Sequence, residues 1–360
     1  MKSPQLLLLG TGTVGTAFVE RHARLRARGV DLPAIAAIGN SRGWRECGAA
    51  GAENALAELR ALPGAAAGVP ARHGFRRGEL VVDASASDAL AARHADWLRQ
   101  GTHVVTACKL GQGAALQRWR AIRDAAAHGG TIYGDSATVG AGLPLLRSLR
   151  ELQDGGDRIH AIAGVLSGSL AWLFNHYDGK RPFSGFVREA HDAGYTEPDP
   201  RDDLSGEDVC RKIVILARAV GFEIEAEAVR VDSLVPQALA GLPRMQLDAA
   251  LPVLDDPLRR RYADAYRNGE VLKFIARFEH GQARVALEAL PADHPLAGGC
   301  GTDNRVAIWS DRYRAQPLVV QGPGAGAEVT AAALIDDVLR ALRASRAPSA
   351  FDHVHRQAAA

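Results

Sequence analysis

The stretch Leu6-Leu7-Leu8-Leu9-Gly10-Thr11-Gly12-Thr13-Val14-Gly15, near the start of the sequence, decides the fold of the first half of the chain. The four leucines predict a buried strand, and the glycines that follow have the spacing G-x-G-x-x-G at the start of a predicted helix over 13–28. Gly10 permits a tight turn, Gly12 lets a pyrophosphate approach the backbone, and Gly15 lets the helix pack closely on the strand. The partially positive amino end of the helix would hold the pyrophosphate. The candidate cofactor-binding residues of this turn are Gly10, Gly12, Thr13, Val14 and Gly15.

The glycine spacing alone also fits a glycine-rich turn in another kind of α/β protein, so its surroundings matter. The further strands predicted in this half lie over 34–38, 80–83, 103–106 and 131–133, and helical stretches lie over 88–99 and 114–128. Such alternation predicts a parallel sheet with helices on both faces, which is a Rossmann dinucleotide-binding domain. The stretch 64–78 is rich in glycine, alanine and proline, which predicts a surface loop.

The pattern changes after Pro144. The predicted elements are then a strand over 158–166, several helices, a long helix over 252–267 and two strands over 271–278 and 283–290. The two last strands flank His280-Gly281-Gln282, which indicates an antiparallel hairpin. This mixture predicts an α+β domain inserted into the first.

Near the end the first pattern returns, and we expect a strand over 317–321 and a helix over 329–343 to rejoin the Rossmann domain. The predicted boundaries are therefore 1–143 and 317–345 for the Rossmann domain, 144–316 for the inserted domain and 346–360 for a tail.

Composition excludes several classes of protein. A formal net charge of +2, without a run of basic residues, argues against a nucleic-acid partner. The start has no apolar core of the ~7–15 residues that a secretory signal needs, and no run approaches the ~20 apolar residues of a membrane span. The four cysteines form no C-x-x-C pair, which argues against a disulfide or zinc framework. We expect a cytoplasmic protein without a membrane partner.

The end of the second predicted strand concerns the choice of cofactor. It reads Ile38-Gly39-Asn40-Ser41-Arg42, without the acidic residue that commonly binds the ribose of NAD. Arg42 could meet the 2′-phosphate of NADP, so we expect NADP to be accepted at least as well as NAD. The alternative is a solvated arginine. Asn40 and Arg42 are the candidate cofactor-binding residues here.

The stretch from Gly194 to Lys212 combines acids, prolines and a helix start. Two prolines and four acids over 197–203 predict a rigid polar loop. Ser205 is predicted to cap a helix that runs to Val220, with Arg211 and Arg218 on the side opposite its apolar stripe. Glu197 would lie beside this helix.

Asp208 and Lys212 are four residues apart on that helix, at the edge of the apolar stripe. Two carboxylates and an ammonium suit a small zwitterion, because the acids can bind an amino group and the lysine can handle a proton. The alternative is a surface ion pair, worth about 0.3–0.5 kcal/mol.

At these residues the sequence resembles the homoserine dehydrogenase family. The family's signature is matched nearly throughout Gly194–Lys212, and the resemblance as a whole covers about residues 5–345. Other matching segments are Val104–Lys109, Val139–Pro144, Gly164–Leu170 and Gly324–Gly326 with Val329–Ala332. The resemblance is closest to the dehydrogenase portion of the bacterial aspartokinase–homoserine dehydrogenases, without a kinase portion.

The resemblance implies a reversible reaction in threonine and methionine biosynthesis, in which L-aspartate 4-semialdehyde and NAD(P)H give L-homoserine. It implies that Glu197 and Asp208 bind the substrate and that Lys212 donates the proton. Lys109 would lie near both cofactor and substrate, and we favour Lys212 over it as the donor. The resemblance also implies cofactor contacts by Ser85, Gly194 and Gly326.

The resemblance further implies a monovalent cation, such as Na⁺, bound by the backbone carbonyls of Val139, Ala141 and Leu143. The family often has a glutamate where this chain has Ser136, which weakens that expectation. It also implies a homodimer formed through the inserted domain, which would bind the substrate. The carboxy-terminal regulatory domain of many members is not recognised here, so we do not expect feedback inhibition by threonine through it.

Two other functions fit parts of the pattern. Another semialdehyde or hydroxy-acid dehydrogenase could use the same scaffold, and a phosphorylating one would need a nucleophilic cysteine. Cys108 and Cys210 have no histidine near them in the sequence, and we expect Cys108 to be a small buried residue. A protein that only senses a nucleotide would have no need for Glu197, Asp208 and both lysines.

Overall fold

Two units, each built around its own sheet, make up the computed structural model of the chain. It describes residues 4–62 and 75–346, so most of the loop expected over 64–78 and the tail expected after 346 lie outside the described residues. The first unit comprises residues 1–111, 120–137 and 327–360, and the second comprises residues 112–119 and 138–326.

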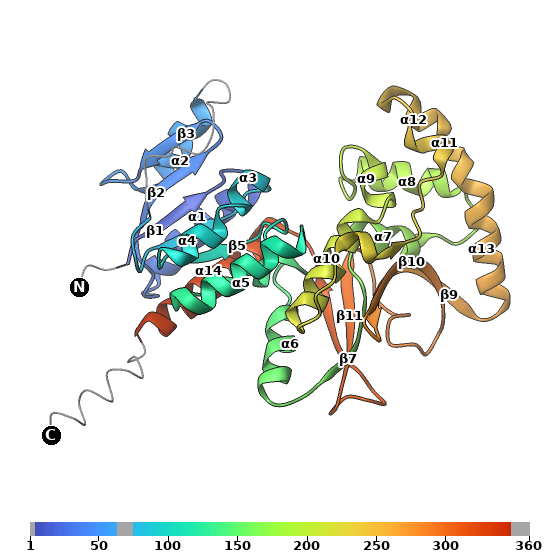
Figure 1. Ribbon diagram of the computed structural model, residues 1–360. Helices are drawn as coiled ribbons and strands as arrows, with labels where there is room; N and C mark the ends of the chain where they lie inside the picture. Colours follow the sequence, from blue (N-terminus) through green and yellow to red (C-terminus); the bar gives the residue numbers. More distant parts are fainter. Residues whose placement is uncertain (1–3, 63–74, 347–360) are drawn as a thin grey trace. The chain divides into compact units, whose positions relative to one another are not determined.

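The sheet of the first unit has the strand order β3-β2-β1-β4-β5-β6. Figure 1 labels β1, β2, β3 and β5 of this sheet. Its strands are β1 (Leu6–Leu9), β2 (Ile35–Asn40), β3 (Gly43–Glu46), β4 (Leu80–Asp83), β5 (His103–Thr106) and β6 (Tyr133–Gly134). The helices are α1 (Thr13–Ala27), α2 (Gly51–Ala61), α3 (Asp88–Ala91), α4 (His94–Arg99), most of α5 (Leu116–Gly129) and α14 (Ala327–Arg346), with a 3₁₀ turn at Ser136–Thr138. All neighbouring strands are parallel except β3, which pairs antiparallel with β2.

Alternate residues of β1 enter two different cores. Leu8 packs in a cluster with residues of α1 and α14, whereas Leu7 packs in a cluster with Trp97 of α4 and Ile122 of α5. Helices therefore cover both faces of the sheet, as the sequence predicts. The helix predicted over 88–99 is divided into α3 and α4 by a turn at Ala92 and Arg93, a break that no glycine or proline signals.

The sheet of the second unit has the order β12-β11-β7-β9-β10-β8. Its strands are β7 (Ile159–Val165), β8 (Arg230–Val231), β9 (Glu270–Glu279), β10 (Gln282–Pro291), β11 (Asp303–Ser310) and β12 (Leu318–Pro323). Its helices are α6 (Leu145–Asp154), α7 (Gly168–His176), α8 (Phe183–Asp192), α9 (Pro200–Leu204), α10 (Glu207–Ala219), α11 (Gln237–Ala240), α12 (Arg244–Ala250) and α13 (Asp255–Arg267), with 3₁₀ turns at Ala226–Ala228 and Leu251–Leu254. Most pairs are antiparallel, and only β8 and β10 run parallel.

The predicted hairpin is confirmed as β9 and β10. Glu279 pairs with Gln282, so His280 and Gly281 form a two-residue turn. Both have positive φ, 51° and 76°, as a tight hairpin turn of this hand requires. The sheet and α10 share one core, in which Ile213 and Phe274 are buried.

One expectation about the domain boundary is wrong. The strand predicted over 317–321 does not rejoin the first sheet, because β12 pairs antiparallel with β11. Only α14 returns, and the first unit resumes at Ala327. The local pattern of a short apolar strand does not specify its partner, so the sequence could not distinguish the two sheets.

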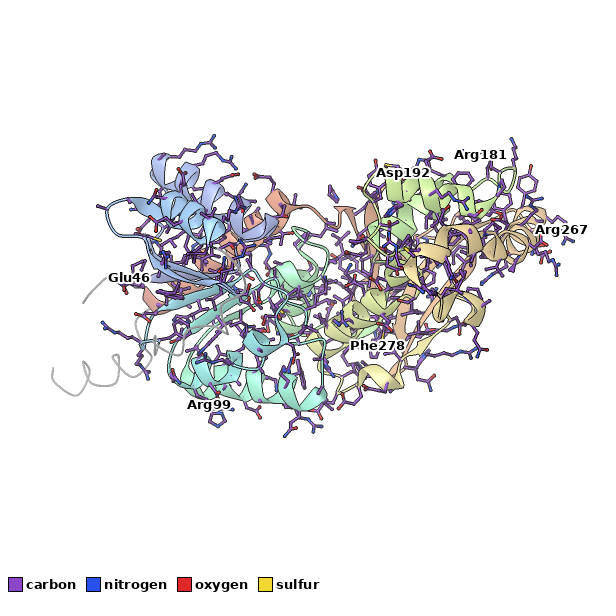
Figure 2. The ribbon with its side chains drawn as sticks, turned by 90° about the horizontal axis from the view of Figure 1, so that it is seen from above. Glu46, Arg99, Arg181, Asp192, Arg267 and Phe278 are labelled. Carbon is purple, nitrogen blue, oxygen red and sulfur yellow. The ribbon has the colours of Figure 1, made fainter. Side chains whose placement is uncertain are left out.

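The surface of the second unit is rich in charged side chains. Arg181, just before α8, and Arg267, at the end of α13, extend outward, whereas Phe278 is 1% exposed (Figure 2). Among residues 4–62 and 75–346, no helix combines the length and the apolarity needed to cross a membrane.

Candidate functional site

The glycines after β1 differ in what the fold demands of them. Gly10 has φ 99°, and a Cβ there would lie 2.8 Å from the Ala84 carbonyl carbon. A Cβ on Gly15 would lie 2.0 Å from the Gly10 oxygen. Gly12, in contrast, has φ −72°, and a Cβ there would meet nothing within 4 Å. The fold itself would accept a side chain at position 12. The motif's need for glycine there is therefore explained by a ligand that approaches the backbone at this position.

We expect Gly12→Ala to fold normally and to lose at least tenfold in affinity for NADPH, or about 1.4 kcal/mol. The added methyl group would occupy the space that a pyrophosphate needs. Fluorescence titration with NADPH and a thermal melt measure the two effects. Gly15→Ala is the matched variant, which should lower the melting temperature. A Gly12→Ala protein that binds NADPH as tightly as the wild type would contradict this role.

A cavity of about 690 Å³ lies at the carboxyl ends of β1, β2 and β4. β1 stands between β2 and β4, where the strand order reverses, and such switch points hold ligands in open α/β sheets. The cavity is lined by Leu9, Gly10, Thr11, Gly12, Gly39, Asn40, Ser41, Arg42, Arg60, Ala84, Ser85, Ala86, Ser87, Ala89 and Leu90. Five of the predicted cofactor residues are therefore brought together: Gly10, Gly12, Asn40, Arg42 and Ser85. The adjoining Thr13, Val14 and Gly15 form the first turn of α1 and do not line this cavity.

Two arginines lie at the β2 end of this cavity. The Arg42 guanidinium donates to the Arg60 carbonyl at 2.8 Å, and its backbone N–H donates to Asn40 Oδ1 at 2.7 Å. Asn40 Nδ2 in turn donates to Thr11 Oγ1 at 2.8 Å. Arg60, on α2, donates to the Thr11 carbonyl at 3.4 Å. Sequence reasoning missed Arg60, because only the fold brings α2 to the glycine turn.

In the second unit, Lys212 on α10 is buried and held on two sides. Its Nζ donates to the Leu166 carbonyl at 2.7 Å and lies 2.8 Å from Asp208 Oδ2. The side chain is 11% exposed, against 42% for Asp208. The pairing of Asp208 with Lys212 is as the sequence predicts, but the lysine is too buried for a simple surface ion pair.

Asp203 links the acidic segment to this region. Its carboxylate accepts from the Glu197 backbone N–H at 2.8 Å and from Ser169 Oγ at 2.6 Å. Burial raises the pKa of Asp203, and the neighbouring carboxylates of Glu197 and Asp208 raise it further, while these hydrogen bonds oppose the shift. Three carboxylates and one ammonium are thus gathered in this unit, which suits a ligand that carries a positive charge.

Two expectations about the helix start are wrong. The segment 197–203 is not all loop, because Pro200–Leu204 forms α9, with the Asp199 side chain as its cap and Pro200 in its first turn. Ser205 does not cap α10. Gly206, with φ 79°, takes that position because the chain must reverse sharply between two helices.

The expectation that Arg218 lies on the outer side of α10 is also wrong. Its side chain is fully buried, and its guanidinium donates to the carbonyls of Gln112, Ala114 and Ile224. From the sequence alone, an arginine on the polar face of a helix is predicted to be exposed to solvent. The buried carbonyls that accept from Arg218 are brought to it only by the fold.

Asn304 on β11 was not predicted as a site residue. Its Nδ2 donates at 3.4 Å to the Leu166 carbonyl, which also accepts from Lys212. The residue is 1% exposed, and its Oδ1 has no partner within the described part of the chain. A Cβ on Gly324 would overlap the Asn304 amide, so this glycine is required by packing. The alternation of polar and apolar residues along a strand does not reveal that a single asparagine such as Asn304 is buried beside a lysine's hydrogen-bond partner.

Three further predicted residues, Lys109, Gly194 and Gly326, lie outside the lining of the cavity in the first unit. Lys109 follows β5 in the first unit, half-buried. Gly194 follows α8 with φ 73°, and Gly326 immediately precedes α14 with φ 124°.

The buried cysteines do not resemble nucleophiles. Burial raises the pKa of the Cys108 thiol to about 11, and burial also raises the pKa of Cys210. Thiolates are therefore disfavoured at neutral pH. This agrees with the expectation of a small buried residue at 108 and weighs against a phosphorylating dehydrogenase.

The turn over 139–143 is strained. Gly140 and Ala141 both have positive φ, 74° and 51°, and Ala141 is a buried non-glycine residue. Strain of this kind gathers at ligand sites. Ser136 Oγ donates to Asp337 Oδ1 at 2.9 Å, within the first unit. In residues 4–62 and 75–346, no group of three His, Cys, Asp or Glu side chains is placed to hold a metal.

Two family models cover most of the chain. Residues 10–134 match the NAD-binding domain of homoserine dehydrogenase, and residues 144–339 match the homoserine dehydrogenase domain that accompanies it.

Known proteins give the same result. Bifunctional aspartokinase/homoserine dehydrogenase 2 of Escherichia coli is 45% identical over 262 residues, which are 72% of this chain and 32% of that protein. The chain thus spans about a third of the length of its bifunctional relatives. Homoserine dehydrogenase of Emericella nidulans is 37% identical over 276 residues, covering 73% of this chain and 75% of that protein. A crystal structure of a Candida auris protein of unknown function superposes with a TM-score of 0.85 and 32% identity, over 94% of this chain and 98% of that one. The chain belongs to the homoserine dehydrogenase family and matches the dehydrogenase portion of its bifunctional members.

Proposed function

We propose that this protein catalyses the reversible, NAD(P)H-dependent reduction of L-aspartate 4-semialdehyde to L-homoserine. The observation that carries the proposal is Lys212, buried and held between the Leu166 carbonyl and Asp208. A nicotinamide cofactor in the cavity of the first unit would supply the hydride. The turn from Gly10 to Gly15 would hold its pyrophosphate, and Ser85 would contact it in the same cavity.

Reduction of an aldehyde places negative charge on its oxygen, which requires a proton. Lys212 would donate that proton from Nζ, and it is held in place for this by Asp208. Glu197 and Asp208 would bind the substrate's ammonium group. Lys109 is the alternative donor, and Gly194 and Gly326 would contact the cofactor through their backbones.

The test is to follow nicotinamide absorbance while L-aspartate 4-semialdehyde is added to the purified protein with NADPH or NADH. We expect rapid oxidation that depends on the substrate. A protein that binds a dinucleotide but oxidises neither cofactor would refute the reaction and favour a sensor or another dehydrogenase.

We further propose that Arg42 and Arg60 bind the 2′-phosphate of NADP. Both arginines line the cavity, and β2 ends in an asparagine rather than an acid. We expect the double change Arg42→Ala and Arg60→Ala to raise KM for NADPH by about 10- to 100-fold, because charge-assisted hydrogen bonds contribute about 1.5–3 kcal/mol. KM for NADH should change less than threefold. Equal losses with the two cofactors would contradict the assignment.

Three finer features belong to the proposal. A monovalent cation would bind the carbonyls of Val139, Ala141 and Leu143, and replacing NaCl with choline chloride in the assay would test it. A homodimer formed through the second unit would be tested by light scattering. A cytoplasmic location agrees with the four free thiols, and fractionation of cells would test it.

A further inference from the structure

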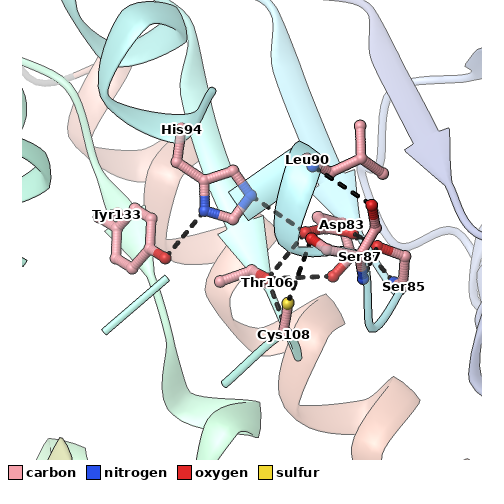
Figure 3. A network of polar contacts seen from close by, with 8 residues as sticks. All are labelled: Asp83, Ser85, Ser87, Leu90, His94, Thr106, Cys108 and Tyr133. Carbon is pink, nitrogen blue, oxygen red and sulfur yellow. Dashed lines mark hydrogen bonds and ion pairs between the residues drawn. The ribbon is translucent and has the colours of Figure 1, made fainter. Parts of the chain in front are cut away.

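A chain of polar contacts that is buried at its centre links Tyr133 of β6 to Ser85 and Ser87 in the first unit (Figure 3). Asp83 ends β4 and His94 begins α4, and both are 0% exposed. His94 Nε2 lies 3.0 Å from Asp83 Oδ2, and His94 Nδ1 lies 3.0 Å from the Tyr133 hydroxyl. Neither Asp83 nor His94 lines the cavity, and neither has a part in the proposed reaction.

The other carboxylate oxygen of Asp83, Oδ1, is hydrogen-bonded to Ser85, a residue that lines the cavity. Asp83 Oδ1 accepts from the Ser85 backbone N–H at 2.9 Å and from Ser85 Oγ at 2.6 Å. Ser85 Oγ then accepts from the Ser87 N–H at 3.2 Å, and Ser87 Oγ caps α3 by accepting from Leu90 N. Ser85 and Ser87 both line the cavity, so this chain ends on the surface that would contact a cofactor.

The proton positions follow from the partners. A carboxylate only accepts, so His94 Nε2 must carry a proton, and in the neutral ring Nδ1 then accepts from the Tyr133 hydroxyl. Ser85 donates its one hydroxyl proton to Asp83. Toward the cavity, Ser85 Oγ can therefore act only as an acceptor, which suits a ligand hydroxyl or amide N–H.

The same network touches the loop after β5. Thr106 Oγ1 donates to the Asp83 carbonyl at 3.1 Å and accepts from the Cys108 backbone N–H at 2.8 Å. A Cβ on Gly111 would lie 2.2 Å from the Tyr133 hydroxyl. The loop that carries Lys109 thus packs at both ends against members of the network.

We propose that His94 is a positioning residue for cofactor binding, which acts by holding Asp83 so that Asp83 fixes the Ser85–Ser87 segment. The proposal rests on the proposed function, since it assumes that the cavity binds a nicotinamide dinucleotide. Side chains that contact a ligand keep their geometry through such outer hydrogen bonds. Losing the His94 contact would let the Asp83 carboxylate turn away from Ser85.

The test is the Kd of NADPH, measured by fluorescence titration without substrate, for His94→Phe and His94→Gln. We expect His94→Phe to weaken binding by about tenfold, since a hydrogen bond to a charged group is lost. Glutamine retains an N–H donor for Asp83, so His94→Gln should recover much of the affinity. Tyr133→Phe, which keeps the ring and removes only the outer partner, should weaken binding by less than threefold.

The matched control is His103→Phe. His103 is also a buried histidine of this sheet, bonded to Ile132 N and Ser345 Oγ, but it begins β5 at the opposite end of the strand. We expect this variant to lose thermal stability as His94→Phe does and to keep the wild-type Kd. If both variants melt earlier and both keep the wild-type Kd, the role of His94 is structural only and the proposal fails. If His94→Phe does not fold, His94→Leu, which is smaller and also lacks a donor for Asp83, takes its place: a Kd weakened by about tenfold would support the proposal, and a wild-type Kd would refute it.

Turnover separates this proposal from the proposed function. A wild-type protein that binds NADPH without reducing L-aspartate 4-semialdehyde refutes the reaction, while a weakened Kd for His94→Phe still supports the positioning role. A wild-type protein that binds neither NADPH nor NADH refutes both.

Discussion

Replacing Lys212 with methionine should lower kcat for the reduction of L-aspartate 4-semialdehyde by about 10²- to 10⁴-fold, the range that a lost general acid produces. Methionine keeps a long apolar stem in a buried position, so α10 should still pack on the sheet. The Kd of NADPH should not change, because the cavity is lined by residues of the first unit only. Steady-state kinetics and a cofactor titration together measure these effects.

The control for this change is Arg211→Met, the adjoining residue on the same helix. It removes one positive charge from α10 and should keep kcat within about twofold, as surface changes usually do. Lys109→Ala distinguishes the two candidate donors. If Lys109→Ala abolishes turnover while Lys212→Met keeps it, Lys109 donates the proton and the assignment is reversed.

Much of the first unit could be predicted because its signals are local. A run of apolar residues bounded by glycine or polar residues fixes a buried strand almost to the residue, as at β1, β4 and β5. Their parallel order follows from the helices between them. The partner of β12 could not be predicted, since its pairing with β11 depends on contacts between distant parts of the chain.

In the candidate site, too, local contacts could be predicted from the sequence, whereas contacts between distant parts of the chain could not. Asp208 and Lys212 are on one helix, so their spacing predicts their contact. The Leu166 carbonyl, which accepts from Lys212, follows β7, and the Asn304 amide that donates to the same carbonyl comes from β11. No spacing in the sequence links these residues to Lys212. Arg60 reaches the glycine turn only through the packing of α2. For α9 the signal was present, since Asp199 before Pro200 is a common helix start.

Arg218 shows that the apolar stripe of a helix does not by itself predict whether a charged residue on the opposite side is exposed. Its guanidinium donates to three backbone carbonyls, and Nη2 lies 3.3 Å from Glu225 Oε2. Burial lowers the pKa of Arg218, and Glu225 opposes that shift. Glu225 also accepts from the Leu116 N–H at 2.9 Å. The segment 112–119 is therefore held in the second unit by side chains that the sequence would place in water.

Arg218→Met should reduce the free energy of unfolding by about 3–5 kcal/mol, because it leaves buried carbonyls and Glu225 without their donor. The melting temperature should fall by about 10 °C. Urea unfolding with a fitted slope and a thermal melt measure the change.

Arg218→Lys should not restore stability, since one ammonium cannot supply the planar fork of donors that reaches all three carbonyls. Arg211→Met, on the same helix and only half-buried, should change stability by less than about 0.5 kcal/mol. Equal stabilities for Arg218→Met and Arg211→Met would mean that water replaces the guanidinium at these carbonyls, and that Arg218 does not hold the 112–119 segment.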